Sequence, residues 1–405
     1  MRSFLKHFLA AQMARQQASH TARAQASPAS RAQASPAVPR LGDIMAPEAN
    51  SFGVLRLAMA LLVLVSHSYL YTSGTQSGEP LHAWTGHSLG QHAVQVFFIL
   101  SGILVAQSFE RSRSIVDFAT ARILRIFPAL IVCVLLTALV LGPTVSRLNF
   151  ADYLASRELL AYIAKTLLLI TGNAPLPGVF ETLPLAHSVN TSLWTLKYEV
   201  LCYMCLALAG LVGLFNRRWR NQATFALICF VILIFAGAPN DPASYGFADH
   251  FRYFALYFGT GVLTYTIKVG LPVHGFPLLP LFTIFLLALG GRFGELATAL
   301  FLAYATVWLA SKSFGPLRGL CNKLDLSFGV YIYAGPIEQA LIWAFPNLHA
   351  LGIAAMTVAL ALPLALLSWV VIEWPALQLR HRLRSRLPRL ASRQLSDPTQ
   401  MQIAG

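Results

Sequence analysis

The feature that most constrains this chain is a succession of apolar segments, each about 18–20 residues long. A helix of about 20 residues rises about 30 Å, which matches the hydrocarbon core of a bilayer. The segments lie at about 53–72, 91–109, 127–144, 193–215, 223–238, 251–269, 274–290, 295–311, 326–344 and 350–373. The pattern therefore predicts an all-α, polytopic integral membrane protein with about ten transmembrane helices.

The composition agrees with this prediction and excludes a water-soluble globular enzyme. Hydrophobic residues make up 56% of the 405 residues, and charged residues only 11%. A soluble chain of this length carries about 25% charged residues. The bilayer is therefore the expected surroundings of most of the chain.

The net charge of +14 is concentrated at the two ends of the sequence. Residues 1–42 contain six Lys and Arg and no acid, and residues 376–405 contain six Arg and one Asp. Basic residues beside apolar helices keep their loops on the cytoplasmic side and face anionic lipid headgroups. We therefore expect both termini to be cytoplasmic. We do not expect nucleic-acid binding, since no aromatic-basic pattern or known module accompanies the charge.

The sequence divides into three parts. Residues 1–50 are rich in Ala, Ser, Gln and Pro, and a seven-residue unit at 23–29 recurs at 31–37; this composition predicts a disordered cytoplasmic leader. Residues 51–378 form the predicted transmembrane domain, and 379–405 a basic cytoplasmic tail. Between two predicted spans, Leu159–Ile170 is too short for a confident crossing, and we interpret it as interfacial or re-entrant.

Arg56 and His67 are the most informative polar residues within the apolar segments. Eleven residues apart on one helix, they lie within about 20° of each other on one face and about 16 Å apart along the axis. Titratable side chains at membrane depth are costly and often mark a site or pathway. The alternative for His67 is a packing role between helices.

Two further sets of charged residues are candidates. Arg122 and Arg125 share a helix face, so their guanidinium groups can grip one polyanion such as a nucleotide phosphate; the alternative is a purely topogenic pair. Glu199 can orient an imidazole or bind a hydroxyl; its alternative is an interfacial pair with Lys197. We expect no metal site, because no His, Cys, Asp or Glu pair has suitable spacing on one helix face.

The order and spacing of six short motifs resemble the membrane acyltransferase family 3, the O-acyltransferases that modify bacterial surface sugars. The resemblance covers most of residues 50–380, in the stand-alone form without a fused esterase domain. The motifs are Arg56-x10-His67, Val96–Gly102, Arg122–Pro128, Ser192–Glu199, Ser327–Pro336 and Ile372–Pro375. One departure is visible, since many members carry His-Phe-Pro where this chain has Ala334-Gly335-Pro336.

The resemblance implies transfer of an acyl group, most simply acetyl, from cytoplasmic acyl-CoA as co-substrate, with no tightly bound cofactor. The acceptor is a hydroxyl of a polysaccharide or lipid-linked glycan at the outer face of the bacterial cytoplasmic (inner) membrane. The resemblance assigns Arg56, His67 and Glu199 to catalysis. The substrate-binding residues expected from the motifs are Arg122, Arg125, Trp194, Ser101 and Tyr331.

Physical reasoning agrees with this mechanism and leaves alternatives open. A thioester is already activated, so the enzyme needs a base for the acceptor hydroxyl, and an imidazole suits that task. Transfer is direct in the first hypothesis, whereas in a second the acyl group rests on His67 or Ser101. The main alternative function is a secondary transporter that uses Arg56 and His67 as a substrate or proton site, although no internal symmetry supports it.

Overall fold

The computed structural model describes residues 38–384, except 173, 214, 216–223, 225, 229–245 and 292. In these ranges the regular elements are helical, and no β-strand occurs among them. The longer helices are α3 (Phe52–Ser73), α5 (Leu89–Arg111), α6 (Ile115–Leu136), α9 (Arg157–Leu167), α10 (Leu196–Leu211), α12 (Phe247–Thr266), α13 (Leu278–Ala288), α14 (Gly294–Ala310), α16 (Ser327–Ala344), α17 (Ala350–Ser368) and α18 (Trp374–Arg384). The short ones are α2 (Leu41–Ile44), η2 (Pro47–Ala49), α4 (His82–Thr85), η3 (Thr137–Leu141), α7 (Gly142–Val145), α8 (Phe150–Ala155), η4 (Thr191–Thr195), α15 (Pro316–Lys323) and η6 (Trp369–Glu373).

These helices confirm the predicted all-α fold, and the long helices coincide with the apolar segments of the sequence. Nine of the ten predicted segments coincide with a helix, and the remaining one, 223–238, falls mostly outside the described residues. In the described part, five helices are long and apolar enough to cross a membrane: Phe52–Ser73, Leu89–Glu110, Ile115–Val145, Thr191–Leu211 and Ala350–Arg380. The chain is therefore a multi-pass membrane protein, and the number of about ten spans stays a prediction.

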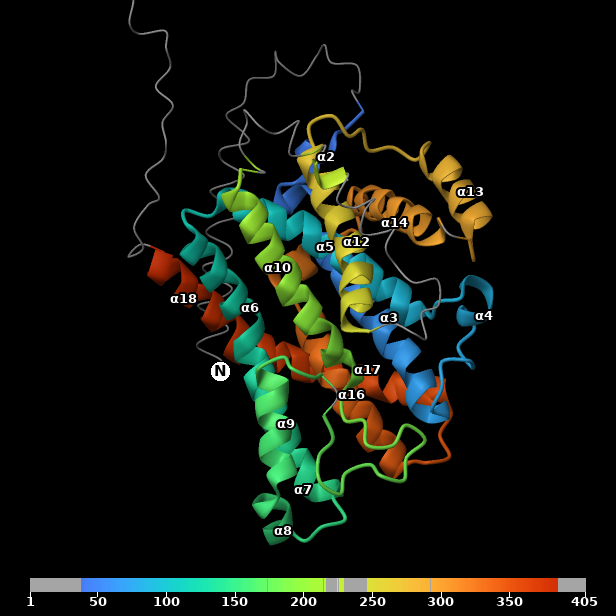
Figure 1. Cartoon of the computed structure of the whole chain (residues 1–405), viewed down its shortest axis with the longest axis vertical. Coiled ribbons are helices and arrows are strands. Elements are labelled where there is room, and N and C mark those ends of the chain that lie inside the picture. The colour runs from blue at the N-terminus through green and yellow to red at the C-terminus, as the bar shows by residue number, and fades with distance from the viewer. Residues whose placement is uncertain are drawn as a thin grey trace, which may run out of the picture. The chain divides into compact units, whose positions relative to one another are not determined.

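Helices α3 and α5 lie at the centre of the described helices (Figure 1). Helix α5 packs against both α3 and α12, and α3 also contacts α16 and α17. Helices α13 and α14 pack against each other, and α14 also contacts α5 and α12. This arrangement brings side chains of α3, α5, α10 and α16 together, although these helices are far apart in the sequence.

The ends of α3 and α5 follow from local sequence. Helix α3 ends at Gly74, whose φ of 75° is easily adopted without a Cβ, and the Gly74 amide donates to the carbonyl of Leu70. Helix α5 begins with a capping box, because the Ser88 hydroxyl accepts from the Gln91 amide and the Gln91 side chain accepts from the Ser88 amide. The start of α5 and Gln76, two residues beyond Gly74, line the larger of the two cavities described below.

In the described part of the chain, two wide π-helical turns each end two residues before a proline. Segment η3 precedes Gly142 and Pro143, and the Ala138 carbonyl accepts a hydrogen bond from the Tyr153 hydroxyl at 2.7 Å. Segment η6 ends at Glu373, two residues before Pro375. A proline lacks an amide hydrogen and crowds the preceding turn, so a π turn there accommodates it without breaking the helix.

Two regions outside the predicted spans have defined structure. Residues 41–50, the last part of the predicted leader, form helical turns in which Leu41 is completely buried and its amide donates to Leu271. The remaining leader residues 1–37 and the tail residues 385–405 lie outside the described residues. The stretch Leu159–Ile170 lies mostly on α9, whose 11 residues are about 16 Å long and too short to cross a bilayer.

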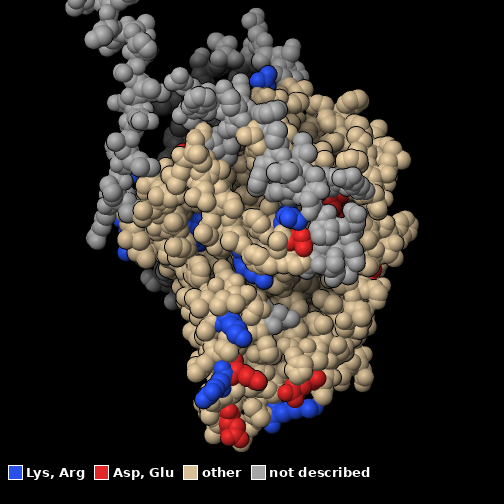
Figure 2. All heavy atoms as spheres, viewed as in Figure 1, with Lys and Arg blue, Asp and Glu red and all other residues tan. Residues whose placement is uncertain are grey.

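Charged side chains are sparse on the bundle surface (Figure 2). On the face shown, Lys, Arg, Asp and Glu gather at the end that α7, α8 and α9 form, and uncharged side chains cover most of the rest. Apolar side chains of the long helices, such as Ile131, Leu139 and Leu360, are exposed. An uncharged surface of this kind is what a bilayer requires of the helices that face it.

The closest approach between α5 and α12 generates a stability prediction. A Cβ at Gly102 would lie 2.2 Å from the Phe258 carbonyl oxygen, and one at Gly261 would lie 2.2 Å from the Ile99 carbonyl oxygen. We expect Gly261→Ala to force the helices apart and cost about 1–3 kcal/mol. The measurement is the melting temperature of the detergent-purified protein. Gly319→Ala is the control, since nothing lies within 4 Å of its Cβ position; equal melting temperatures for both variants would contradict the close approach.

Candidate active site

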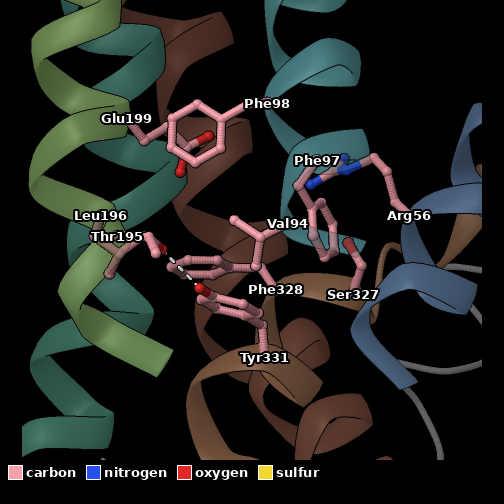
Figure 3. A pocket seen from close by; sticks show the side chains of 10 residues that line it. All are labelled: Arg56, Val94, Phe97, Phe98, Thr195, Leu196, Glu199, Ser327, Phe328 and Tyr331. Carbon is pink, nitrogen blue, oxygen red and sulfur yellow. Dashed lines mark hydrogen bonds between the residues drawn. The ribbon is translucent and has the colours of Figure 1, made fainter. Parts of the chain in front are cut away.

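Two neighbouring cavities lie between the central helices. The smaller has a volume of about 70 Å³, and Figure 3 shows the side chains around it. Its lining residues are Arg56, Val94, Phe97, Phe98, Thr195, Leu196, Glu199, Ser327, Phe328 and Tyr331. The larger has a volume of about 160 Å³ and is lined by His67, Gln76, His87, Ser88, Gly90, Gln91, Val94, Ser192, Trp194, Thr195, His250, Tyr253, Phe254 and Tyr331.

Three residues line both cavities and form the wall between them: Val94, Thr195 and Tyr331. The Tyr331 hydroxyl donates to the Ser192 carbonyl at 2.7 Å and lies 2.7 Å from the Thr195 hydroxyl (Figure 3). These bonds tie α16 to η4. The two chambers are therefore adjacent, and a hydrogen-bonded tyrosine from α16 stands between them.

Arg56 and His67 each line one of the two cavities. Helix α3 runs without interruption from Phe52 to Ser73, so the two residues lie about 16 Å apart along its axis. Arg56 lines the smaller cavity and His67 the larger one. Helix α3 therefore spans both chambers, with a cation at one end and an imidazole at the other.

The His67 ring is held by η4 and by its own helix. Its Nδ1 lies 3.3 Å from the Ser192 hydroxyl, and the ring packs edge-on against Tyr71 at 5.9 Å between centroids. The Tyr71 hydroxyl accepts from the Thr191 amide at 2.9 Å. Segment η4 therefore contacts the imidazole itself and also binds Tyr71, which packs against the ring. The same segment is anchored to α16 by Tyr331.

Arg125 lies in an ion-pair network. Its guanidinium group lies 2.7 Å from a carboxylate oxygen of Asp325 and 2.9 Å from one of Glu373. Arg56 forms an ion pair with the same Asp325 oxygen. Burial alone would raise the pKa of Asp325, but the Arg125 and Arg56 guanidinium groups lower it to about 2. Asp325 is therefore ionised throughout the physiological pH range.

Arg122 has different surroundings from Arg125. Its Nη2 donates to the Ser108 hydroxyl at 3.2 Å, and its guanidinium carbon lies 5.8 Å from the centre of the Tyr203 ring. Its buried Nε has no hydrogen-bond partner among the described residues. Of the two predicted phosphate-binding arginines, Arg122 thus has a donor to spare, whereas Arg125 is occupied by two carboxylates.

Glu199 belongs to a polar group on the far side of the smaller cavity from Arg56 (Figure 3). It accepts hydrogen bonds from the Ser101 hydroxyl at 3.0 Å and from the Tyr203 hydroxyl. Lys197, the alternative partner, instead lies over the Tyr198 ring at 4.9 Å. Ser101, a predicted substrate-binding residue, is thus within hydrogen-bond reach of both Glu199 and Tyr203.

Trp194 lies on the wall of the larger cavity, whereas Arg122 and Arg125 line neither cavity. Its ring packs edge-on against His250 at 5.0 Å and against Phe254 at 5.4 Å. The other three predicted substrate-binding residues divide between the chambers: Trp194 lines the larger, Ser101 contacts the smaller through Glu199, and Tyr331 borders both.

A pair of residues that the sequence did not indicate lies beside the larger cavity, and His87 is the member of the pair that lines it. His87 Nε2 lies 2.7 Å from Glu295 Oε1, and the Tyr257 hydroxyl donates to the other oxygen of Glu295. His87 Nδ1 is buried and has no hydrogen-bond partner among the described residues. Such an unpaired group costs about 1–3 kcal/mol. The one signal in the sequence was that a carboxylate, Glu295, stands at the start of an apolar segment. That signal did not indicate His87 as its partner.

Packing explains why glycine stands at position 335, within the Ala334-Gly335-Pro336 segment that departs from the His-Phe-Pro of many family members. A Cβ at Gly335 would lie 2.8 Å from the Asn190 side-chain oxygen and 2.9 Å from the Tyr71 hydroxyl oxygen. A larger residue would therefore displace the segment that leads into η4. Glycine lets α16 approach the contacts that position His67.

The fold and the two cavities define a multi-pass membrane protein with a buried polar site, and the comparisons with known proteins identify its family. The family described as "Acyltransferase domain" matches residues 50–374, so the chain belongs to the acyltransferase 3 family. The chain is similar to the "O-acetyl transferase" of Shigella phage Sf6, with 29% identity over 342 residues that cover 80% of this chain and 95% of the relative.

A second relative extends this similarity. "Nodulation protein 10" of Rhizobium leguminosarum bv. viciae is 28% identical over 378 residues, covering 83% of this chain and 95% of the relative. No solved structure matches significantly. The family and the phage relative together support an enzyme that transfers acyl groups, so the family expected from the six motifs is confirmed.

The ion-pair network generates a prediction on stability. Arg125→Ala leaves Asp325 and Glu373 without their shared cation, and we expect a loss of about 3–5 kcal/mol. Adding Glu373→Gln should recover part of the loss, because one uncompensated carboxylate is removed. The readout is thermal unfolding in detergent. Arg122→Ala is the matched control and should melt near the wild type; similar melting temperatures for the two arginine variants would rule out the network as a stabilising element.

Proposed function

We propose that this acyltransferase moves an acyl group, most simply acetyl, from cytoplasmic acyl-CoA to a hydroxyl of a cell-surface or exported polysaccharide or glycolipid. The observation that carries the proposal is α3, which links an arginine-lined chamber to a histidine-lined one. Acetyl is supported by the name of the phage relative, "O-acetyl transferase". The membrane is the bacterial cytoplasmic membrane, with both termini in the cytoplasm, as the basic ends favour.

The arginine side of the site is proposed as the donor end. Phosphates of acyl-CoA are polyanionic, and guanidinium groups bind phosphate with charge-assisted hydrogen bonds. Asp325 and Glu373 balance the charges of Arg56 and Arg125, so the phosphate contact falls mainly to Arg122, whose Nε has no partner in the part of the chain that the structure describes. The pantetheine arm would then extend along α3, past the wall at Tyr331, toward His67.

The chemistry proposed at His67 is general-base catalysis. The acceptor oxygen attacks the thioester carbonyl carbon, so that a C–O bond forms and the C–S bond breaks. His67 takes the proton of the acceptor hydroxyl, and the departing thiolate of CoA takes up a proton in turn. Ser192, 3.3 Å from Nδ1, orients the ring so that the other nitrogen can act as base. Glu199 lines the donor chamber and accepts hydrogen bonds from Ser101 and Tyr203.

The first test of this function concerns His67. His67→Gln keeps a polar side chain but cannot accept the proton at neutral pH, so we expect transfer to fall by about 10²–10⁴. The assay measures radiolabelled acetyl passing from acetyl-CoA to de-O-acylated surface polysaccharide in membrane vesicles, with the amount of membrane-inserted protein measured in parallel. Tyr69→Phe on the same helix is the control. Normal transfer by a well-inserted His67→Gln protein would exclude His67 both as base and as acyl carrier.

The second test concerns the donor. We expect Arg122→Ala to weaken acetyl-CoA binding by about 1.5–3 kcal/mol without a matching loss of stability, since Arg122 forms no ion pair in the network. Lysine should recover only part of the affinity, because it lacks the planar guanidinium fork. Isothermal titration of the purified variants with acetyl-CoA gives the affinity. An unchanged dissociation constant for Arg122→Ala would assign the residue to topology or packing.

A further inference from the structure

His87, which also lines the larger cavity, has the geometry of an oriented hydrogen-bond acceptor. His87 comes from the loop before α5, Glu295 from the first turn of α14 and Tyr257 from α12. Glu295 lies 2.7 Å from His87 Nε2 and also accepts from the Tyr257 hydroxyl. Three separate elements therefore fix the orientation of one imidazole at the cavity wall.

The Glu295 contact determines which ring nitrogen of His87 is available. A carboxylate accepts hydrogen bonds, so Nε2 carries the hydrogen that it donates to Glu295. In the neutral ring Nδ1 then has a lone pair directed away from Glu295, and it has no partner among the described residues. The group that completes this arrangement is a hydrogen-bond donor such as a hydroxyl.

The rest of the cavity wall suits a polyhydroxylated molecule. Gln76, Ser88 and Gln91 contribute amide and hydroxyl groups to the cavity wall. The rings of Trp194 and Tyr253 also line the cavity. A sugar offers hydroxyls to the polar groups and C–H faces to the aromatic rings. The volume of about 160 Å³ is well above the roughly 10–15 Å³ that one water occupies by the same kind of measure.

We propose that the larger cavity is the acceptor site, and that His87, held by Glu295, binds a hydroxyl of the acceptor sugar other than the one that reacts. This inference rests on the proposed transferase function and deepens it. His67 takes the reacting proton, and His87 Nδ1 accepts a hydrogen bond from a second hydroxyl of the same acceptor. His87 thereby determines how the acceptor is oriented toward the thioester. The acceptor class is a glycan rather than a simple alcohol, because His67 and His87, which both line the cavity, bind two hydroxyls of one molecule.

The test separates acceptor binding from chemistry. Purified wild type and His87→Gln are assayed with acetyl-CoA and with de-O-acylated surface polysaccharide from the bacterium that carries the gene. We expect KM for the polysaccharide to rise about tenfold in His87→Gln, as loss of one hydrogen bond implies, while kcat and KM for acetyl-CoA stay near the wild-type values. His82→Gln, the same change five residues earlier in helix α4 and outside both cavities, should leave all three constants unchanged.

A second variant covers the case in which His87→Gln does not fold. Tyr257→Phe leaves the His87–Glu295 pair in place and removes one of the two hydrogen bonds to Glu295. We expect a smaller rise in KM for the polysaccharide, again without a change in KM for acetyl-CoA. Such a split between the two substrates is not what a merely structural role produces, since looser packing would impair both.

Each contrary result has a distinct meaning. An unchanged KM for the polysaccharide in a folded His87→Gln protein overturns the acceptor contact. A large loss of kcat with unchanged KM also overturns it and makes His87 the base. Parallel losses in both KM values and in melting temperature, for both variants, assign the pair to structure alone. If the wild type transfers no acetyl to the polysaccharide, the proposed function itself fails, whatever the variants do.

Discussion

The shared carboxylate of Asp325 is the interaction on which the arginine side of the site depends. It precedes α16 and pairs with Arg56 of α3 and Arg125 of α6 at once, while Glu373 of η6 pairs with Arg125 from the other side. Charges in a poorly hydrated interior are tolerated only when they are paired. Two cations and two carboxylates thus neutralise each other. Their contacts hold α3, α6, η6 and the residue before α16 together.

This compensation also explains why the three arginines differ in their chemistry. Arg56 and Arg125 are neutralised within the protein, whereas Arg122 has neither a carboxylate contact nor a partner for its Nε among the described residues. This difference is the reason why we propose Arg122 as the phosphate contact. The same network shapes the floor of the smaller cavity, because Arg56 and Ser327, which donates to Asp325, both line it.

The link between the two chambers is made by hydrogen bonds of η4. Ser192 contacts His67 through its hydroxyl and Tyr331 through its carbonyl, so the residue that orients the imidazole also anchors the wall. The backbone before η4 passes Gly335 at a distance that leaves no room for a larger side chain. The orientation of His67 and the separation of the chambers are therefore coupled through one short segment.

Much of the fold could be predicted because a membrane helix has a simple length requirement. Segments of about 20 apolar residues, such as 53–72 and 91–109, correspond to α3 and α5, since backbone groups in lipid must be satisfied within the helix. The relation between Arg56 and His67 was equally accessible, because both lie on one helix and its periodicity is known. The six motifs were sufficient to identify the family.

Contacts between distant segments were not accessible in the same way. Arg125 and Glu373 are 248 residues apart, and nothing in the spacing of either indicates the other. Glu199 has a neighbour of opposite charge at Lys197, yet residues two apart on a helix point in different directions, and Glu199 instead meets Ser101 of α5. The pairing of His87 with Glu295 likewise depends on how α14 packs beside α5.

The sequence by itself determined the all-α membrane fold, the family and the alignment of Arg56 with His67, because all of these depend on local periodicity or on short motifs. Only the tertiary structure decided which charges compensate each other, which arginine keeps a free donor and which histidine has a carboxylate partner. The physical reason is that hydrogen bonds and ion pairs act over about 3 Å, whereas the positions that form them are set by the packing of whole helices.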